Sequence, residues 1–154
     1  MTDHVLVPVD DSDRSTQALE FACREYPDAT ITALHVVDPG DFHAAVGPEG
    51  GAMADHDEMQ KRYENRAESI LEDARELAAE YGCDLETEYQ IGGVSGSIVE
   101  YTDISRSIVE YADEHDVDLI AIGSHGRAGA SRILLGSVAE TVARRSPVPV
   151  AIVR

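Results

Sequence analysis

Five short apolar runs alternate along the chain with segments of helical periodicity, and this alternation restricts the fold more than any other feature. The runs are Val5 to Val9, Thr30 to Val37, Leu85 to Ile91, Val117 to Ile122 and Val148 to Val153. Strands joined through helices need right-handed crossovers, which place helices on both faces of a parallel sheet. The length of 154 residues is usual for one domain. We therefore expect residues 1–154 to form a single α/β domain, doubly wound around a five-stranded parallel sheet.

Signals for helix ends separate these runs. Asp10-Asp11-Ser12 can cap a helix that Pro27 closes. After the second run, a loop from Asp38 to about Asp55 leads into a long amphipathic helix. Gly82 is the expected stop of that helix, because glycine is the usual residue just beyond a helix C-terminus.

A ten-residue repeat precedes the fourth run. Its copies are Ser97-Ile-Val-Glu-Tyr101 and Ser107-Ile-Val-Glu-Tyr111, and each begins with the Ser-x-x-Glu pattern of a helix start. In one continuous helix the two apolar patches would lie roughly 80° out of phase. We therefore expect a short helical turn, a break near Thr102 to Ser105, and a main helix from about Ser107 to His115.

The composition excludes several classes of protein. A net charge of −18 argues against a general surface for nucleic acid or anionic membrane, because duplex binding uses Lys and Arg at the phosphates. No apolar run approaches the roughly 18 residues of a membrane span, and residues 1–4 lack the features of a signal peptide. We expect a cytoplasmic protein that does not enter membranes. Cys23 and Cys83 stand outside any C-x-x-C pair in core-like segments, so we expect buried free thiols rather than a disulfide.

The kind of acidity is also informative. Eleven of the twelve basic residues are Arg, and the thirty acids divide equally between Asp and Glu. This balance resembles proteins of a salt-loaded cytoplasm, as in halophilic organisms. Five glutamates recur every four residues and should repel one another along one helix face: Glu64, Glu68, Glu72, Glu76 and Glu80. Salt screens such repulsion, so we predict a fold that needs salt.

Only the end of the chain has a net positive charge. Residues 1–120 hold seven Lys and Arg against twenty-nine Asp and Glu, whereas residues 121–154 hold five Arg against Glu140 alone. Two of these arginines, Arg127 and Arg132, follow the fourth apolar run. This last fifth of the chain is the part suited to an anion.

Glycines mark a candidate anion site in the same region. In a doubly wound sheet, ligands bind beyond the carboxyl ends of the strands, where the strand order reverses. The fourth run ends in Gly123-Ser-His-Gly126, and Gly136-Ser137-Val138 opens the last helix. Glycines allow backbone N–H groups to approach an anion, and a helix start adds unpaired donors and a positive dipole end. Gly123, Gly126, Gly136 and Ser137 therefore form a candidate phosphate cradle.

Other sites are less well supported. The chain has neither G-x-G-x-x-G nor G-x-x-x-x-G-K-[ST], and Gly93-Val-Ser-Gly-Ser97 departs from the nucleophile elbow at its fifth position. Asp10-Asp11 resembles the acidic pair of response regulators, but the only Lys is Lys61, far from the last strand. The six histidines show no metal-ligand spacing. We interpret His35 as a packed strand residue and His125 as a loop residue.

Five motifs extend over nearly the whole chain: Val5-Leu-Val-Pro-Val-Asp10, Leu34-His-Val-Val-Asp38, Asp118-Leu-Ile-Ala-Ile-Gly-Ser-His-Gly126, Leu135-Gly-Ser-Val138 and Pro147-Val-Pro-Val150. Within them G-x-x-G-x9-G-[ST] is complete. Together they resemble the universal stress proteins, specifically the ATP-binding branch. The resemblance implies a Rossmann-like fold of the adenine nucleotide alpha hydrolase-like type, with strand order 3-2-1-4-5. It also implies ATP with Mg²⁺ between strands one and four, and homodimers through the last strand.

The resemblance also assigns roles to residues. Asp10 would face the ribose or a phosphate-bound metal ion, and Arg127 lies in the phosphate loop. Ala139 departs from the hydroxyl residue of some ATP-binding members. The adenine would be bordered by Pro8, Val9, Val36 and Ile122, and the phosphates would be held by Gly123, Gly126, Gly136, Ser137 and Val138.

Three functions remain open. The first is a regulatory ATP-binding stress protein with slow hydrolysis, because no residue is placed as a general base and no catalytic residue is assigned. The second is an ATPase or nucleotidyl enzyme in which Asp10 holds the metal and His125 assists a water. The third is a dimeric interaction module without nucleotide, since the apolar last strand would otherwise be an exposed edge.

Overall fold

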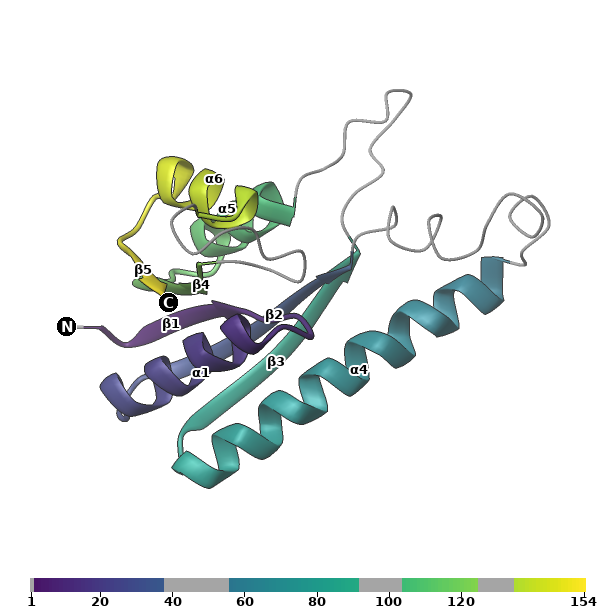
Figure 1. The fold of residues 1–154 in the computed structure, drawn as a ribbon, viewed down its shortest axis with the longest axis horizontal. Helices are drawn as coiled ribbons and strands as arrows, with labels where there is room; N and C mark the ends of the chain where they lie inside the picture. Colours follow the sequence, from purple (N-terminus) through teal and green to yellow (C-terminus); the bar gives the residue numbers. More distant parts are fainter. Residues whose placement is uncertain (1, 38–55, 92–103, 125–134) are drawn as a thin grey trace.

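The computed structural model describes residues 2–37, 56–91, 104–124 and 135–154, in which all five expected strands pair into one sheet (Figure 1). The strands are β1 (His4–Pro8), β2 (Thr30–Val37), β3 (Asp84–Ile91), β4 (Leu119–Gly123) and β5 (Val150–Val153). Neighbouring strands are parallel, and their order is β3-β2-β1-β4-β5. The predicted doubly wound, five-stranded parallel sheet is therefore confirmed, and its order reverses between β1 and β4.

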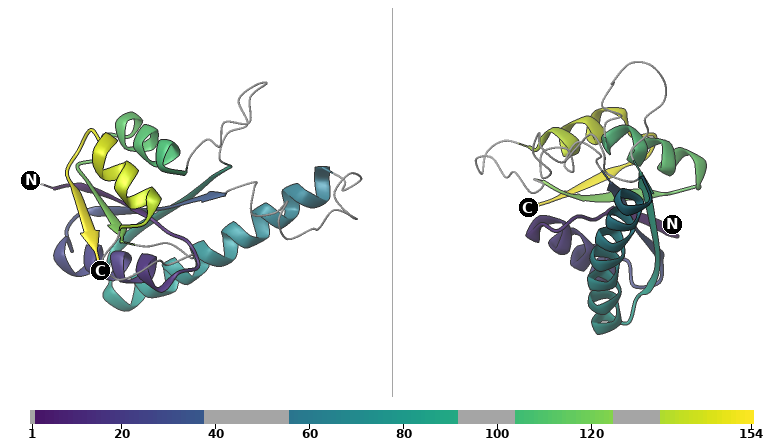
Figure 2. Two further views of the ribbon diagram at one scale, coloured as in Figure 1. Left: turned by 45° about the horizontal axis from the view of Figure 1, so that its top comes forward. Right: turned by 90° about the vertical axis from the view of Figure 1, so that its right-hand side faces the viewer.

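Helices cover both faces of the sheet. Figure 2 shows α1 (Asp13–Glu25) and α4 (His56–Tyr81) on one face, with α5 (Ile104–Glu114) and α6 (Ser137–Arg145) on the other. Alternate side chains of β1 serve the two faces: Val5 and Val7 pack with α1 and α4, whereas Leu6 packs with α5 and α6. All three are fully buried. Within the described ranges, no helix is both long and apolar enough to span a membrane.

The expected helix ends at α1 and α4 are confirmed. Ser12 is the N-cap of α1, and its side chain accepts the N–H of Ser15. Gly82 follows the last residue of α4 with a φ of +67°, a left-handed conformation that favours glycine. No atom lies within 4 Å of a Cβ built on Gly82, so only its backbone conformation favours glycine there.

Several boundaries differ from the sequence prediction. The break predicted near Thr102 to Ser105 is wrong at its end, because α5 already begins at Ile104. Ser105 and Ile108 are both fully buried, so the buried face of α5 begins before Ser107. The first copy of the repeat lies outside the described residues.

The last two strands begin two residues later than predicted, at Leu119 and Val150. The N–H of Val117 donates to Ala112 of α5 at 3.4 Å, and Asp116 has a φ of 51°. Val117 therefore belongs to the turn that ends α5 rather than to β4, although it is buried and apolar. Pro149 cannot donate a backbone hydrogen bond, and its carbonyl accepts the N–H of Ile120 at 3.0 Å.

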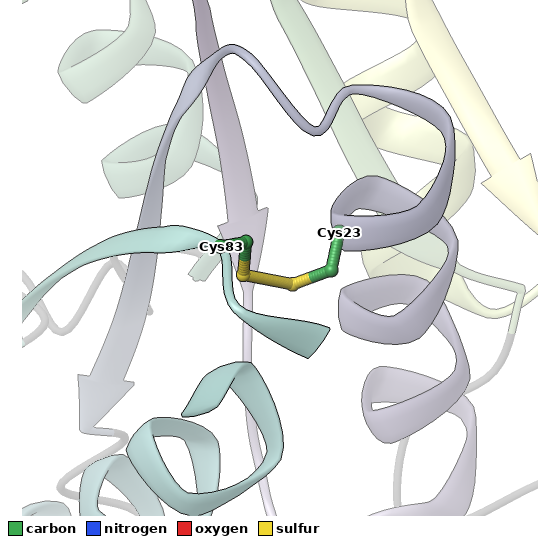
Figure 3. The surroundings of a disulfide bond; sticks show 2 residues. All are labelled: Cys23 and Cys83. Carbon is green, nitrogen blue, oxygen red and sulfur yellow. A yellow bond between two sulfur atoms is a disulfide. The ribbon is translucent and has the colours of Figure 1, made fainter. Parts of the chain in front are cut away.

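The expectation of free thiols is wrong. Cys23, in the last turn of α1, forms a disulfide with Cys83, which lies between α4 and β3 (Figure 3). Their Cα atoms are 5.6 Å apart, although 60 positions separate them in sequence. The pairing follows from the packing of α1 beside the α4–β3 connection, which sequence spacing does not reveal. The predicted burial is correct for Cys23, of which only 3% is exposed.

Candidate functional site

The carboxyl ends of β1 and β4 meet at the reversal of strand order, where doubly wound proteins bind ligands. β1 ends at Pro8 and continues through Asp10 into α1. β4 ends at Gly123, and the chain re-enters the described structure at Leu135, just before α6. Two helix N-termini therefore follow the two central strands, and they differ in chemistry.

Side chains at the start of α1 form hydrogen bonds with the backbone N–H groups and hydroxyls of the same segment. The Asp10 Oδ1 atom accepts the N–H of Ser12 at 2.8 Å and also the Ser12 hydroxyl. The Ser15 hydroxyl accepts the N–H of Asp10 at 3.1 Å and lies 3.1 Å from the Asp10 carbonyl oxygen. Asp11 and Asp13 add further negative charge. This helix start is unsuited to a phosphate, but among the described residues the Oδ2 atom of Asp10 has no hydrogen-bond partner and could bind a cation.

The start of α6 has the opposite character. Its N-cap is Gly136, which has no side chain to accept the N–H groups of the first turn. The N–H of Gly136 itself donates to the Ser124 carbonyl at 2.7 Å, so a role as phosphate donor competes with this bond. The N–H groups of Ser137 and Val138, together with the exposed Ser137 side chain, are better placed for an anion.

Gly123 has a packing role. A Cβ at this position would lie 2.8 Å from the backbone carbon and oxygen of Arg14, in the first turn of α1. Only a residue without a side chain allows α1 to approach the end of β4 this closely. Gly123 therefore sets the spacing between the two halves of the candidate site, whether or not its N–H contacts a ligand.

The residues expected around an adenine divide between the two faces of the sheet. Val36 and Ile122 belong to the apolar cluster under α5 and α6, the face on which α6 begins. Val9 belongs to the cluster under α1 and α4. Its N–H donates to the Leu34 carbonyl at 2.9 Å, and Pro8, which ends β1, is half-buried. Val36 and Ile122 can share one ligand surface, whereas the Val9 side chain packs on the other side.

Two charged or polar side chains near this edge were not among the expected site residues. His35 is buried, as interpreted from the sequence, and its Nδ1 donates to the Val9 carbonyl at 2.8 Å. Burial lowers the pKa of His35 below 6.5 and the Arg66 charge acts in the same direction, while the Val9 carbonyl and the carboxylates of Asp10 and Asp11 oppose it. His35 is therefore a neutral imidazole that holds the backbone just before Asp10.

Arg66 reaches this edge from α4. Its Nη2 atom lies 3.4 Å from Asp11 Oδ2, and both side chains are partly exposed. The two residues are 55 positions apart, so no local pattern in the sequence indicates the pair. Arg66 thus brings a positive charge to the negative start of α1.

Some expected residues lie outside the described ranges. They include Gly126 and Arg127 of the cradle, with His125 and Arg132 beside them. Within the described ranges, no group of three or more His, Cys, Asp or Glu side chains is placed to hold a metal ion.

The strand order defines a doubly wound α/β protein, and the carboxylate after β1 and the uncapped helix that follows β4 place its candidate ligand edge between these two strands. The model of the Universal stress protein family matches residues 1–154. The chain belongs to this family.

Individual relatives agree over almost the whole length. The chain is 34% identical over 154 residues to the universal stress protein MJ0531 of Methanocaldococcus jannaschii, covering 97% of this chain and 81% of that protein. Its fold is similar to that of the universal stress protein UspA from Lactobacillus plantarum, with a TM-score of 0.75, 26% identity and coverage of 99% and 98%. It is also similar to a universal stress protein solved in complex with cAMP, with a TM-score of 0.69, 26% identity and coverage of 99% and 97%.

Proposed function

We propose that this protein is a regulatory, ATP-binding universal stress protein that takes ATP with Mg²⁺ at the edge between β1 and β4. The observation that carries the proposal is the uncapped N-terminus of α6, the helix that follows β4 in the element order, in contrast with a self-capped and acidic α1. A helix start without a side-chain cap offers N–H donors and a positive dipole end to a phosphate. The cAMP complex of a similar family member supports an adenine nucleotide as the ligand.

The parts of ATP have distinct candidate partners in this proposal. The adenine lies on the α6 side of the sheet, against Val36 and Ile122 and beside Pro8. The phosphates accept hydrogen bonds from the N–H groups of Ser137 and Val138 and from the Ser137 hydroxyl, with Gly126 and Arg127 completing the cradle. Mg²⁺ is held by the phosphate oxygens and by Asp10, whose Oδ2 atom the α1 cap leaves unused.

Substitution of the α6 N-cap tests the proposal. Gly136→Asp supplies a side-chain acceptor for the first-turn N–H groups and places a negative charge where the phosphate would lie. Because Gly136 has a φ of −63°, an N-cap aspartate fits its backbone conformation. We expect an unchanged or slightly raised melting temperature and a loss of ATP affinity of roughly tenfold or more, the worth of one or two hydrogen bonds to a charged group.

Gly136→Ser is the matched control, because it caps the helix without adding charge. We expect it to weaken ATP binding less than Gly136→Asp in titration calorimetry. Wild-type ATP affinity in both variants would contradict the site. Mass spectrometry of small molecules released from freshly purified protein gives the ligand directly, and release of no nucleotide would favour a nucleotide-free interaction module.

A second candidate function is ATP hydrolysis with a metal at Asp10, favoured by the unused Oδ2 atom of that residue. Turnover by purified protein separates the two functions. A kcat near the median enzyme value of about 10 s⁻¹ that falls in Asp10→Ala would identify an enzyme. We expect much slower turnover, because His35 is buried with its Nδ1 bonded to the Val9 carbonyl and is therefore poorly placed to activate a water beside Asp10.

The proposal also includes a homodimer and a salt-rich cellular environment. β5 forms one edge of the sheet and carries no charged residue, so a second copy of the chain can pair there to give a homodimer. The acidic composition supports a halophilic, salt-loaded cytoplasm as the setting.

A further inference from the structure

We propose that Cys23 and Cys83 form a reversible thiol–disulfide exchange site that reacts with low-molecular-weight thiols and their disulfides and clamps α1 to the start of β3. The two residues are the only cysteines of the chain. Figure 3 shows them facing each other from α1 and from the connection that precedes β3. The proposal is independent of nucleotide binding.

The backbone around Cys83 is built to hold it in reach of Cys23. The left-handed Gly82 ends α4, its N–H donating to Ala79 at 3.2 Å, and the N–H of Cys83 donates to Ala78 at 3.2 Å. These bonds turn the chain from the end of α4 toward the C-terminal end of α1, where Cys23 lies. The resulting Cα separation of 5.6 Å lies within the usual range of a disulfide.

The fold supports both redox states. All eight residues of β3 pair with β2, so strand pairing holds β3 in place without the cross-link. Cys23 lies in the apolar cluster of α1, α4 and the sheet, and Cys83 packs at its margin. A buried thiol behaves as a small apolar side chain, so the reduced pair suits the same surroundings. Reduction would release one covalent tie between α1 and β3 and leave the hydrogen-bonded sheet intact.

The difference in burial between the two cysteines determines which sulfur is attacked. Cys23 is 3% exposed, whereas Cys83 is only partly buried. An incoming thiolate therefore attacks the Cys83 sulfur, the S–S bond breaks, and Cys23 leaves as a thiolate that takes up a proton. A second thiol attacks the mixed disulfide and releases Cys83. The net reaction converts the protein disulfide and two small thiols into two protein thiols and one small disulfide, and oxidation is its reverse.

The cross-link should affect stability because it closes a long segment. The cysteines are 60 positions apart in sequence, and the segment between them includes β2 and α4. Closing a segment of this length removes chain entropy from the unfolded state, and the corresponding rise in melting temperature is roughly 10 °C for a domain of this size.

The first experiment equilibrates the full-length protein in glutathione buffers of stepped ratio, quenches with acid, alkylates the free thiols and measures both mass and melting temperature. We expect a reversible change from no alkylated cysteine to two, with the melting temperature falling by roughly 10 °C. Cys83→Ser is the control, and its melting temperature should match reduced wild type at every ratio. Two free thiols at every ratio, a bond that opens only in denaturant, or a melting temperature that ignores the bond would each overturn the proposal.

The second experiment tests the direction of attack. Native Cys23→Ala, which keeps Cys83, is incubated with oxidised glutathione beside native Cys83→Ser, which keeps Cys23. We expect a glutathione adduct on Cys83 and none on Cys23 until the protein is unfolded. Adduct formation on Cys23 at an equal or greater rate would show that the buried sulfur is the one attacked, contrary to the proposal.

Discussion

Gly123 joins the fold to the candidate site through a contact that a single methyl group would disturb. Its missing side chain allows the first turn of α1 to lie against the end of β4, with the Arg14 backbone 2.8 Å from where a Cβ would stand. We expect Gly123→Ala to lower the free energy of unfolding by about 1–3 kcal/mol, because a rigid backbone must shift to admit the methyl group. Urea denaturation measures the change.

Gly82 is the comparison for Gly123, because its surroundings are open and only its φ of +67° favours glycine. Gly82→Asn should cost less than Gly123→Ala, since asparagine tolerates the left-handed conformation. Equal losses in the two variants would argue that close packing is not what requires Gly123.

His35 should make stability depend on pH. Its pKa is lowered in the folded protein, chiefly by burial, so the unfolded chain binds a proton more readily. The stabilising contribution is therefore complete above pH 6.5, the unfolded value, and is lost as the pH falls from 6.5 toward the lower folded pKa. We expect the unfolding free energy to decline over that window in denaturant titrations at stepped pH.

The variant His35→Asn distinguishes the effect of protonating residue 35 from the effect of its hydrogen bond. An asparagine amide can donate to the Val9 carbonyl in place of Nδ1 but does not titrate. The variant should lose the part of the pH dependence below 6.5 that wild type shows. An identical decline in wild type and variant would show that His35 is not its source.

At the residue scale, the sequence marked the strand and helix ends that border the candidate site more clearly than the contacts its residues make. Apolar runs mark the carboxyl ends of three strands, near which Asp10, Val36 and Ile122 lie, and Ser137 opens α6, the last helix. The bond from Gly136 to Ser124, the Gly123–Arg14 contact and the Arg66–Asp11 pair depend on how separate elements pack. No periodicity or spacing in a single sequence reports such contacts.

Among the elements, the two edge strands differ in a way that favours β5 as an interface. β3 carries Asp84, Glu86 and Glu88, and charges on an edge discourage pairing with another chain. β5 has the sequence Val-Ala-Ile-Val, and each of its residues is only partly buried. We expect sedimentation velocity to show a dimer for wild type and a monomer for Ala151→Lys, which places a charge at the middle of this edge.

Glu86→Lys on β3 is the matched control for that experiment and should remain dimeric. A wild-type monomer at high salt, or a monomer produced equally by both substitutions, would exclude β5 as the interface.

The elements themselves were largely predictable, because β-branched runs and helix caps are local signals. The errors fell where local signals compete. Val117 is buried and apolar but completes the end of α5, and Ser105 looked like part of a break although it lies on the buried face of the helix. In both cases tertiary packing, which the sequence pattern does not contain, decided the boundary.

At the scale of the whole molecule, the acidic surface should make the fold sensitive to salt. All five glutamates of the α4 stripe are exposed, and Arg75 forms ion pairs with two of them, Glu68 at 2.7 Å and Glu72 at 2.9 Å. The remaining repulsion weakens as the Debye length falls from about 10 Å at 0.1 M to about 3 Å at 1 M salt. We expect the melting temperature to rise between about 0.1 and 2 M KCl.

The double variant Glu76→Gln and Glu80→Gln is the control for salt, because it removes two charges that no described ion pair uses. Its melting temperature should depend less on KCl than that of wild type. A wild-type melting temperature that stays constant over this range would contradict the prediction of a salt-requiring fold.

The position of β1 at the centre of the sheet has a consequence for synthesis. Val5 pairs on one side with Ile31 and on the other with Leu119, and the Asp118 carboxylate accepts the N–H groups of Asp3 and His4 at 3.0 Å. Translation makes β1 well before its second neighbour β4, because α1, β2, α4, β3 and α5 lie between them in the sequence. During that interval one side of β1 is an open edge, and folding rates fall as such distant contacts accumulate. We therefore expect the growing chain to be prone to aggregation through the unpaired edge of β1 until β4 has been made.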